Sequence, residues 1–176
     1  SEGAEKGFGK AAVLNNDDES SEYFKGLTRV PVVTYGMRGK ADITARDVRQ
    51  DGFSTKFIVR MFGQDVPAAI GLLGDYDAAN CIAAVGAAVS QGVEFFTAVE
   101  SLASFPGVPG RMELIDEGQS YRVVVDIAST EQAMRNVLMM LRTVTPGKLI
   151  VLFGAAGERD VARRRIVGIG HGKCSQ

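Results

Sequence analysis

The stretch FIVRMFGQDVPAAIGLLGDYDAANCIAAVGAAVS, residues 57–90, decides the fold class because its hydrophobic period changes partway along. Apolar side chains alternate at its start, where Phe57, Val59 and Met61 face one way, and this alternation predicts a strand. The turn Gly63-Gln64-Asp65 then reverses the chain, so a β-hairpin is expected.

The second part of the same stretch has a helical composition. Small residues rich in alanine run to Ser90, Asp75 or Asp77 can cap the start, and Gly92 supplies the stop. A hairpin followed by a helix of small residues, which can approach a sheet closely, predicts an α/β domain.

Three further segments complete the first half of the chain. The apolar run 11–15 ends in Asn16-Asp17-Asp18 and predicts a buried strand, as does the run 31–35, while residues 95–104 predict another helix. Two prolines and two glycines in Pro106–Gly110 cannot continue either regular element, so this stretch is the expected domain boundary.

The second half has its own strand and helix pattern. Residues 121–126 predict a buried strand, and 148–153 predict another apolar strand. Between them apolar residues recur at helical spacing, at Ala133, Met134, Val137, Leu138 and Leu141. A strand, a helix and a strand in this order are typical of a parallel sheet.

Composition excludes several classes of protein. The net charge of -1 gives no electrostatic reason for a nucleic-acid or anionic-membrane partner. No apolar run approaches the roughly 20 residues that span a bilayer, and no signal peptide is visible at the start. Cys81 and Cys174 are too far apart in sequence to suggest a metal site or disulfide framework, which favours a reduced, cytoplasmic protein.

One candidate site lies where the strand 121–126 ends. Asp126, Ser129 and Thr130 stand at the junction of a predicted strand and a helix N-terminus, where α/β sheets bind ligands and free backbone amides favour anions. The alternative is that Ser129 and Gln132 form an S-x-x-Q capping box. The two interpretations are compatible, and both stay open at this stage.

Two more stretches attract attention near the end of the chain. The run 153–160 is a glycine-containing turn followed by Arg163, Arg164 and Arg165, whose guanidinium groups suit carboxylate or phosphate, although a solvated helix start explains them as well. The run 168–175 looks like a phosphate loop only superficially, because Val167 replaces the first glycine and Cys174 the Mg²⁺-binding hydroxyl. His171, the only histidine, is expected to be solvated.

Seven segments together resemble the Mur ligases, in the UDP-N-acetylmuramoyl-tripeptide synthetase branch. They are AVLNNDD (12–18), YF and VVTYG (within 23–36), ADITARDVR (41–49), LLGDYDAANCIAA (72–84), VPGRMELID (108–116), VVVDIAST (123–130) and LFGAAGERD (152–160). The resemblance implies an α/β fold in two pieces. Residues 1–107 would be the second half of a Mur-ligase central domain with a mixed sheet, and 108–176 the first half of a Rossmann-like C-terminal domain.

The resemblance also implies roles for individual residues. Asn80 resembles the asparagine that contacts adenine, Arg111 the interdomain arginine that reaches the nucleotide, and Asp126 the acid that holds the ribose. Thr130 resembles the hydroxyl at the same helix start. Arg159 resembles the arginine that grips the carboxylate of the incoming amino acid.

The resemblance further implies ATP and Mg²⁺ as cofactors, with a UDP-MurNAc-dipeptide and an amino acid as substrates of an acid–amino-acid ligase of peptidoglycan synthesis. The 176 residues hold neither the family's phosphate loop nor its Mg²⁺-binding acids, so the chain alone is expected to have no catalytic residue, no metal site and no activity. The family's Asp-Tyr-Ala-His-Thr-Pro run is Asp126-Ile-Ala-Ser-Thr-Glu131 here, and Asp77 replaces a usual asparagine. Two alternatives stay open: a pseudo-ligase module that binds adenine nucleotide weakly, and a structural partner domain. Unpaired strand edges near Val13 and Val151 also predict a homo-oligomer.

Overall fold

The computed structural model describes residues 9–154. The chain divides into two compact units, Ser1–Pro106 and Gly107–Gln176, which are called unit 1 and unit 2. The division falls inside the proline- and glycine-rich stretch that interrupts both kinds of regular structure.

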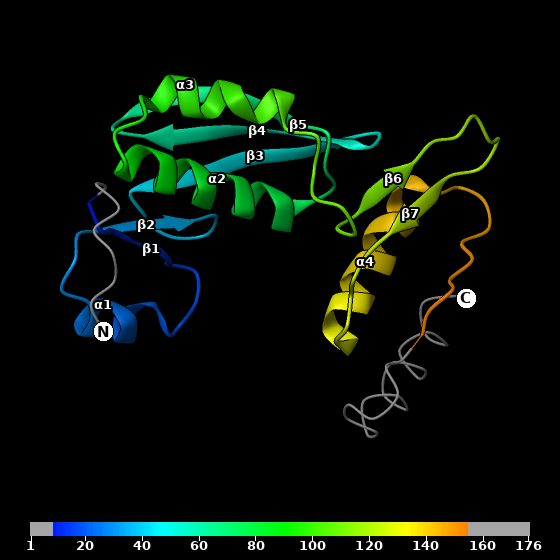
Figure 1. Cartoon of the computed structure of the whole chain (residues 1–176), viewed down its shortest axis with the longest axis horizontal. Coiled ribbons are helices and arrows are strands. Elements are labelled where there is room, and N and C mark those ends of the chain that lie inside the picture. The colour runs from blue at the N-terminus through cyan, green and yellow to red at the C-terminus, as the bar shows by residue number, and fades with distance from the viewer. Residues whose placement is uncertain (1–8, 155–176) are drawn as a thin grey trace. The chain divides into compact units, whose positions relative to one another are not determined.

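Unit 1 is built on a mixed five-stranded sheet (Figure 1). Its strands lie in chain order: β1 (Ala12–Asn15), β2 (Val32–Gly36), β3 (Ile43–Asp51), β4 (Ser54–Met61) and β5 (Gln64–Ile70). The first three strands pair in parallel, and β3, β4 and β5 pair antiparallel. The expected strands and the expected hairpin are therefore present.

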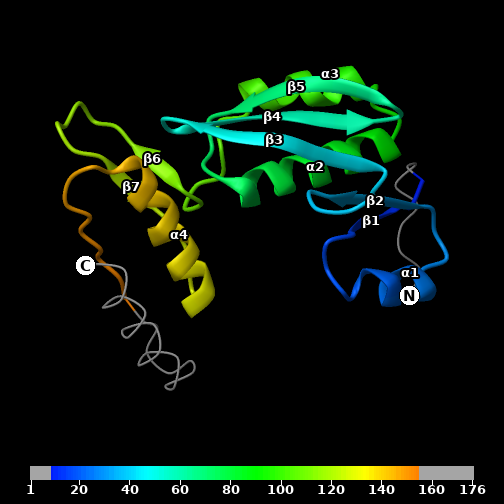
Figure 2. The ribbon, with the colours of Figure 1, turned by 180° about the vertical axis from the view of Figure 1, so that it is seen from behind.

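Four short or medium helices accompany this sheet in the described part of unit 1. They are α1 (Ser21–Leu27), α2 (Asp75–Ser90), α3 (Phe95–Glu100) and the 3-10 helix η1 (Ser101–Ser104). The helices α2 and α3 lie on the same face of the sheet, as the view from behind confirms (Figure 2). The region expected as one helix over 95–104 is thus an α-helix that tightens into a 3-10 turn.

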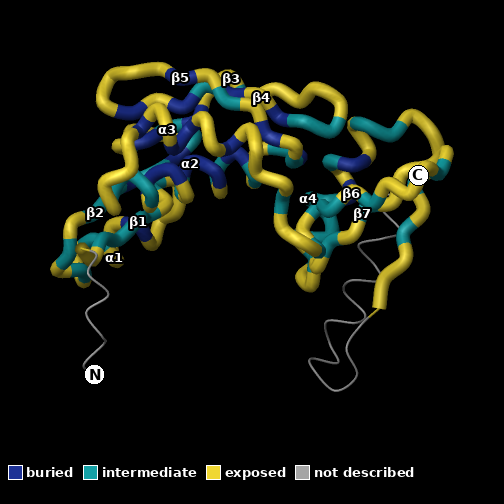
Figure 3. The backbone as a smooth tube through the Cα atoms, turned by 45° about the horizontal axis from the view of Figure 1, so that its top comes forward, coloured by how far each residue is buried: buried dark blue, intermediate teal, exposed yellow. Residues whose placement is uncertain are grey.

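The core of unit 1 lies between this sheet face and α2 and α3. Ile43, Val59 and Ile82 are fully buried, and Phe57, Val85 and other apolar residues surround them. A fully buried side chain of this size contributes about 1.5–3 kcal/mol of hydrophobic stabilisation. Figure 3 shows the buried segments gathered on these strands and on α2.

The small residues of α2 let it approach the sheet closely. A Cβ atom placed on Gly86 would lie 3.4 Å from Val33 Cγ1, 3.5 Å from Val13 Cγ1 and 3.7 Å from Ile43 Cγ2. One position of the helix therefore contacts β1, β2 and β3 at once.

The strand β3 carries a β-bulge. Arg46 pairs with Ile58, and Arg49 pairs with Lys56. Between these pairs, Asp47 and Val48 of β3 stand opposite the single residue Phe57 of β4. Asp47 is the extra residue, with a left-handed φ of 53°. This matches the usual bulge, in which one additional residue bends the strand and leaves the ladder locally unpaired.

Two local predictions for unit 1 are wrong. The turn of the β4–β5 hairpin is not Gly63-Gln64-Asp65 but the two residues Phe62 and Gly63, with φ values of 53° and 75°. Two-residue turns with positive φ at both positions are favoured because their twist matches that of the paired strands. The start of α2 is capped by neither Asp75 nor Asp77, because the N-cap is Gly74, with a φ of 93° that only glycine adopts readily.

Unit 2 contains a two-stranded antiparallel sheet and one longer helix within its described residues. The strands are β6 (Glu113–Ile115) and β7 (Val123–Val125), and the helix is α4 (Glu131–Val144). Leu138 and Leu141 of α4 are buried, while Ala133, Met134 and Val137 are partly buried.

Two strand predictions for unit 2 are also wrong. The strand expected over 121–126 spans only 123–125 and is largely exposed, because its partner is the short β6 of a hairpin and not a parallel neighbour. Residues 148–153 form no strand: Ile150 is 87% exposed and Leu152 98% exposed. A strand is held by its ladder, and no described residue pairs with this run.

Within the described part of the chain, no helix has the length and apolar character needed to cross a membrane.

Candidate functional site

Thr130 immediately precedes α4 and caps its N-terminus. Its hydroxyl oxygen accepts a hydrogen bond from the backbone N–H of Ala133 at 3.1 Å, and its extended backbone is typical of an N-cap. The proposed capping box of Ser129 and Gln132 is therefore wrong, since the Gln132 amide instead donates to Asn136. Ser129 is exposed one residue before the cap.

Asp126, at the end of β7, joins two segments of unit 2. Its Oδ2 accepts from the backbone N–H of Met112 at 2.9 Å, and its Oδ1 accepts from the N–H of Ala128 at 2.7 Å. A carboxylate has about four lone-pair positions, so each oxygen can accept one more hydrogen bond. Half-buried Asp126 can thus receive a hydroxyl donor from a ligand while it keeps both backbone contacts.

Arg111 projects from a tight turn beside Asp126. The turn is closed by the hydrogen bond from the N–H of Arg111 to the carbonyl of Val108, at 3.0 Å. The carbonyl of Gly110 accepts from the N–H of Ile127 at 2.9 Å, which fastens the turn to the segment that follows β7. Arg111 is exposed, and no ion pair within residues 9–154 includes it.

Asn80 lies in unit 1, on the exposed face of α2. The neighbouring Cys81 faces the core, and burial, with a smaller effect of the charge on Asp77, raises the pKa of its thiol to about 11. Since the thiolate is the reactive form, this raised pKa and the burial disfavour reaction at Cys81 near neutral pH. Of the predicted nucleotide-binding residues, Arg111, Asp126 and Thr130 thus belong to unit 2, and Asn80 belongs to unit 1.

Arg159, the predicted carboxylate-binding arginine, lies outside the described residues. The same is true of Arg163–Arg165, the run 168–175 and His171. Among residues 9–154, no three or more His, Cys, Asp or Glu side chains are grouped so that they could hold a metal ion.

An open groove in unit 1 was not anticipated from the sequence. It encloses about 720 Å³ and is lined mainly by apolar residues such as Pro67 and Val99, with Arg49, Lys56 and Glu100 among its charged residues. None of the predicted site residues lines it. Its charged residues are of both signs, so charge alone favours neither an anionic nor a cationic ligand.

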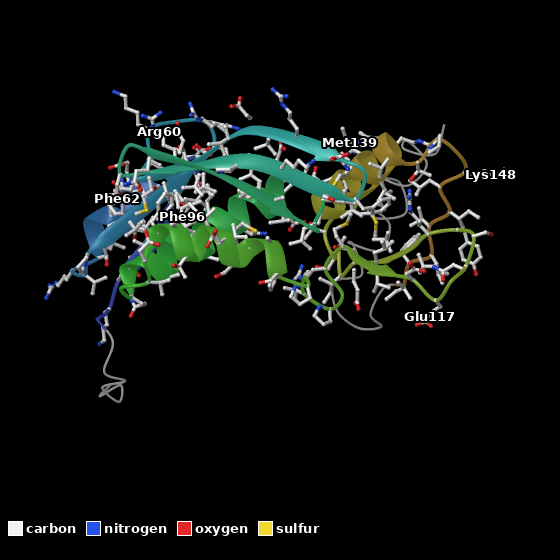
Figure 4. The ribbon with its side chains drawn as sticks, turned by 90° about the horizontal axis from the view of Figure 1, so that it is seen from above. Arg60, Phe62, Phe96, Glu117, Met139 and Lys148 are labelled. Carbon is white, nitrogen blue, oxygen red and sulfur yellow. The ribbon has the colours of Figure 1, made fainter. Side chains whose placement is uncertain are left out.

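Exposed apolar and charged side chains occur on both units. Phe62 and Phe96 lie at one end of unit 1 (Figure 4), and Phe62 contacts Phe95 edge to face with ring centroids 6.5 Å apart. In unit 2, Glu117, Met139 and Lys148 carry exposed side chains (Figure 4).

Two protein families match the chain in succession. Residues 4–88 match the Mur ligase middle domain, and residues 110–169 match the glutamate ligase domain of Mur ligases. The two matches lie on either side of the boundary between the units.

The curated relatives of the chain include ligases that are much longer than the chain itself. The UDP-N-acetylmuramoyl-L-alanyl-D-glutamate--2,6-diaminopimelate ligase of Geobacillus kaustophilus is 35% identical over 158 residues, which are 90% of this chain and 32% of that protein. The ligase of the same name from Streptomyces coelicolor is 37% identical over 162 residues and is covered to the same extent. The chain thus spans about a third of the length of the curated relatives it matches.

Solved structures agree with the fold. A structure of a UDP-N-acetylmuramoyl-L-alanyl-D-glutamate--2,6-diaminopimelate ligase superposes with a TM-score of 0.68 at 26% identity, covering 95% of this chain and 35% of the other. MurF from Acinetobacter baumannii superposes with a TM-score of 0.77 at 19% identity, covering 89% of this chain and 34% of the other, and shows the fold alone.

Proposed function

The chain belongs to the Mur ligase family, and we propose from this that it forms the adenosine-binding side of the ATP site in an ATP-dependent acid–amino-acid ligase. The names of the relatives support UDP-MurNAc-dipeptide and a third amino acid as the substrates of the whole enzyme. In such a reaction a substrate carboxylate is phosphorylated and an amine attacks the acyl phosphate. This step of peptidoglycan precursor synthesis would take place in the cytoplasm.

The observation that carries the proposal is the geometry around Asp126. Its two oxygens hold the backbone of both Met112 and Ala128 and still have lone pairs available. A ribose offers two adjacent hydroxyl donors, which suit a carboxylate held rigidly at the end of a strand. Asp126 would orient the ribose.

Thr130 and Arg111 would complete this part of the site in unit 2. The first turn of α4 presents backbone amides with the positive end of the helix dipole, which favours an anionic ligand. The Arg111 guanidinium is exposed and can pair with a phosphate oxygen, in one or two hydrogen bonds. Asn80 of unit 1 offers an amide, which can both donate to and accept from an adenine edge.

The remaining roles come from the family and not from the described geometry. Arg159 would bind the carboxylate of the incoming amino acid. Mg²⁺ would neutralise the charge that develops during phosphoryl transfer, and no residue of the described part is assigned to hold it. Self-association through the edge strand β1, near Val13, also stays a prediction, whereas the run around Val151 forms no strand and offers no such edge.

Titration with adenosine, ADP and ATP, followed by amide chemical shifts, tests the proposal. Contacts to adenine and ribose should give dissociation constants on the order of 1 mM, about 4 kcal/mol, within a few-fold of one another. The shifts should centre on Asp126 and Thr130, and Mg²⁺ should change them little. Asp126→Ala should abolish saturation, whereas the neighbouring exposed variant Ser129→Ala should bind as the wild type does.

Two results would contradict the proposal. One is an absence of saturable shifts at Asp126 and Thr130 with any of the three ligands. The other is a Ser129→Ala effect as large as that of Asp126→Ala, which would mean that the assay reports general disturbance of the α4 start.

A further inference from the structure

Three consecutive backbone amides around Arg111 are each held by a different acceptor. The N–H of Gly110 donates to Glu113 Oε2 at 2.7 Å, the N–H of Arg111 donates to the carbonyl of Val108 at 3.0 Å, and the N–H of Met112 donates to Asp126 Oδ2 at 2.9 Å. The turn is therefore fixed on both sides of the arginine. Two of the three acceptors are carboxylates, which make hydrogen bonds of roughly twice the usual strength.

The backbone of this turn needs such support. Met112 has a left-handed φ of 47°, a conformation that costs about 1–3 kcal/mol for a residue other than glycine. The surrounding structure must over-determine such a conformation for it to persist. Glu113 and Asp126 lie on neighbouring strand ends, since Glu113 pairs with Val125 in the β6–β7 ladder.

We propose that Glu113 is a positioning residue for the nucleotide, because its carboxylate holds the Gly110 amide and thereby fixes the turn that presents Arg111. This inference rests on the proposed function, since Arg111 is the group that would contact the phosphate. Glu113 itself is half-buried and points back along the turn, so it need not touch the ligand. It forms no ion pair within 4.0 Å with Arg111 among the described residues, so the guanidinium stays available.

Two substitutions separate the hydrogen bond from the charge. Glu113→Gln keeps a carbonyl oxygen that can accept from the Gly110 amide, whereas Glu113→Ala removes the acceptor. Loss of a hydrogen bond to a charged group should accelerate amide exchange at Gly110 about tenfold in Glu113→Ala. Glu113→Gln keeps a weaker, neutral hydrogen bond and should accelerate it only about threefold. Equal exchange rates at Gly110 in wild type and Glu113→Ala would overturn the proposal, whatever the chain binds.

A double-mutant cycle on ATP binding tests whether Glu113 acts through Arg111. An exposed pair of an arginine and a phosphate is worth little, so Arg111→Ala should raise the ATP dissociation constant about threefold. Glu113→Ala should raise it by a similar factor, and Glu113→Gln should raise it less, because the glutamine oxygen still accepts from the Gly110 amide. In the Arg111→Ala background, Glu113→Ala should have no further effect, because the residue it positions is gone.

The outcomes separate the two proposals. A Glu113→Ala effect that is equally large with and without Arg111 would assign Glu113 a general structural role and would refute positioning. If the wild type binds no nucleotide while Gly110 exchange responds as expected, the proposed function fails and the positioning of the Arg111 turn stands. Thermal unfolding of each variant serves as the control that nucleotide binding and amide exchange are compared on folded protein.

Discussion

Replacing Thr55 by valine should destabilise unit 1 by far more than its small change in shape suggests. Thr55 is 1% exposed, and its hydroxyl bridges two backbone groups: it donates to the carbonyl of Leu72 at 2.7 Å and accepts from the N–H of Gly74 at 2.9 Å. Valine fills the same volume and leaves both groups unsatisfied. A buried polar group without a partner costs about 1–3 kcal/mol, so Thr55→Val should cost about 2–4 kcal/mol after partial relaxation.

Thr55→Ser is the matched control. Serine keeps both hydrogen bonds and removes one buried methyl group, which costs about 1 kcal/mol. Urea unfolding monitored by the amide signals of β4 and α2 would measure both variants within unit 1. A Thr55→Val variant as stable as Thr55→Ser would refute the assignment of the hydroxyl as the anchor of the α2 N-terminus. Since Asn80 lies in the second turn of α2, its signals should also broaden in Thr55→Val.

Three further results are expected. Thr130→Ala should destabilise unit 2 by about 1 kcal/mol in urea and Ser129→Ala by no more than about 0.5 kcal/mol, because only Thr130 caps α4; equal effects would contradict the cap assignment. Gly86→Ala should leave the free energy of unfolding unchanged or raise it by up to about 1 kcal/mol, because alanine favours the helix. Gly86→Leu should lower it by about 1–3 kcal/mol, because the larger side chain overpacks against the sheet. A leucine variant as stable as the wild type would show that α2 does not pack closely on β1, β2 and β3. Hydrogen bonds from the Thr34 amide and hydroxyl lower the pKa of Asp42, so its contribution is complete above the ordinary value of 3.8 and is lost as the pH falls through the folded value. The stability advantage of wild type over Asp42→Asn in urea should therefore shrink between about pH 6 and about pH 3, and a constant difference would contradict this origin.

The sequence predicts those elements that have a strong local pattern. The C-terminal end of α2 at Ser90 follows from its composition and from Gly92, and the β4–β5 hairpin follows from alternation. The cap of α2 could not be predicted, because its amide at Gly74 is satisfied by Thr55, a buried side chain 19 positions earlier. Such a contact depends on the tertiary fold and leaves no local signal.

The errors in unit 2 have a similar cause. The run 148–153 is apolar enough for a strand, but a strand forms only where a neighbour supplies the ladder. Periodicity does not predict β6, since three residues are too few to show a period. The helix cap is displaced by one residue from Ser129 to Thr130, an offset finer than pattern reasoning resolves.

The candidate site could be predicted in part. The residue types at the strand-to-helix junction indicate Asp126 and Thr130 on their own, and both side chains lie at that junction in the folded chain. The role of Glu113 was missed, although its spacing of three residues from Gly110 is the spacing at which a side chain can return to a backbone amide. That spacing is visible in the sequence and was the one available signal.

The bulge in β3 predicts where this domain can change its length. Without Asp47, Arg46 would still pair with Ile58 and Arg49 with Lys56, and Val48 would stand opposite Phe57 in a regular ladder. Deletion of Asp47 would therefore leave every other side chain of β3 on its present face of the sheet. Deletion of any residue from 43 to 46 would instead move some side chains of β3 to the opposite face. In an alignment of related chains, we expect a gap at position 47 to be tolerated and gaps just before it to be rare.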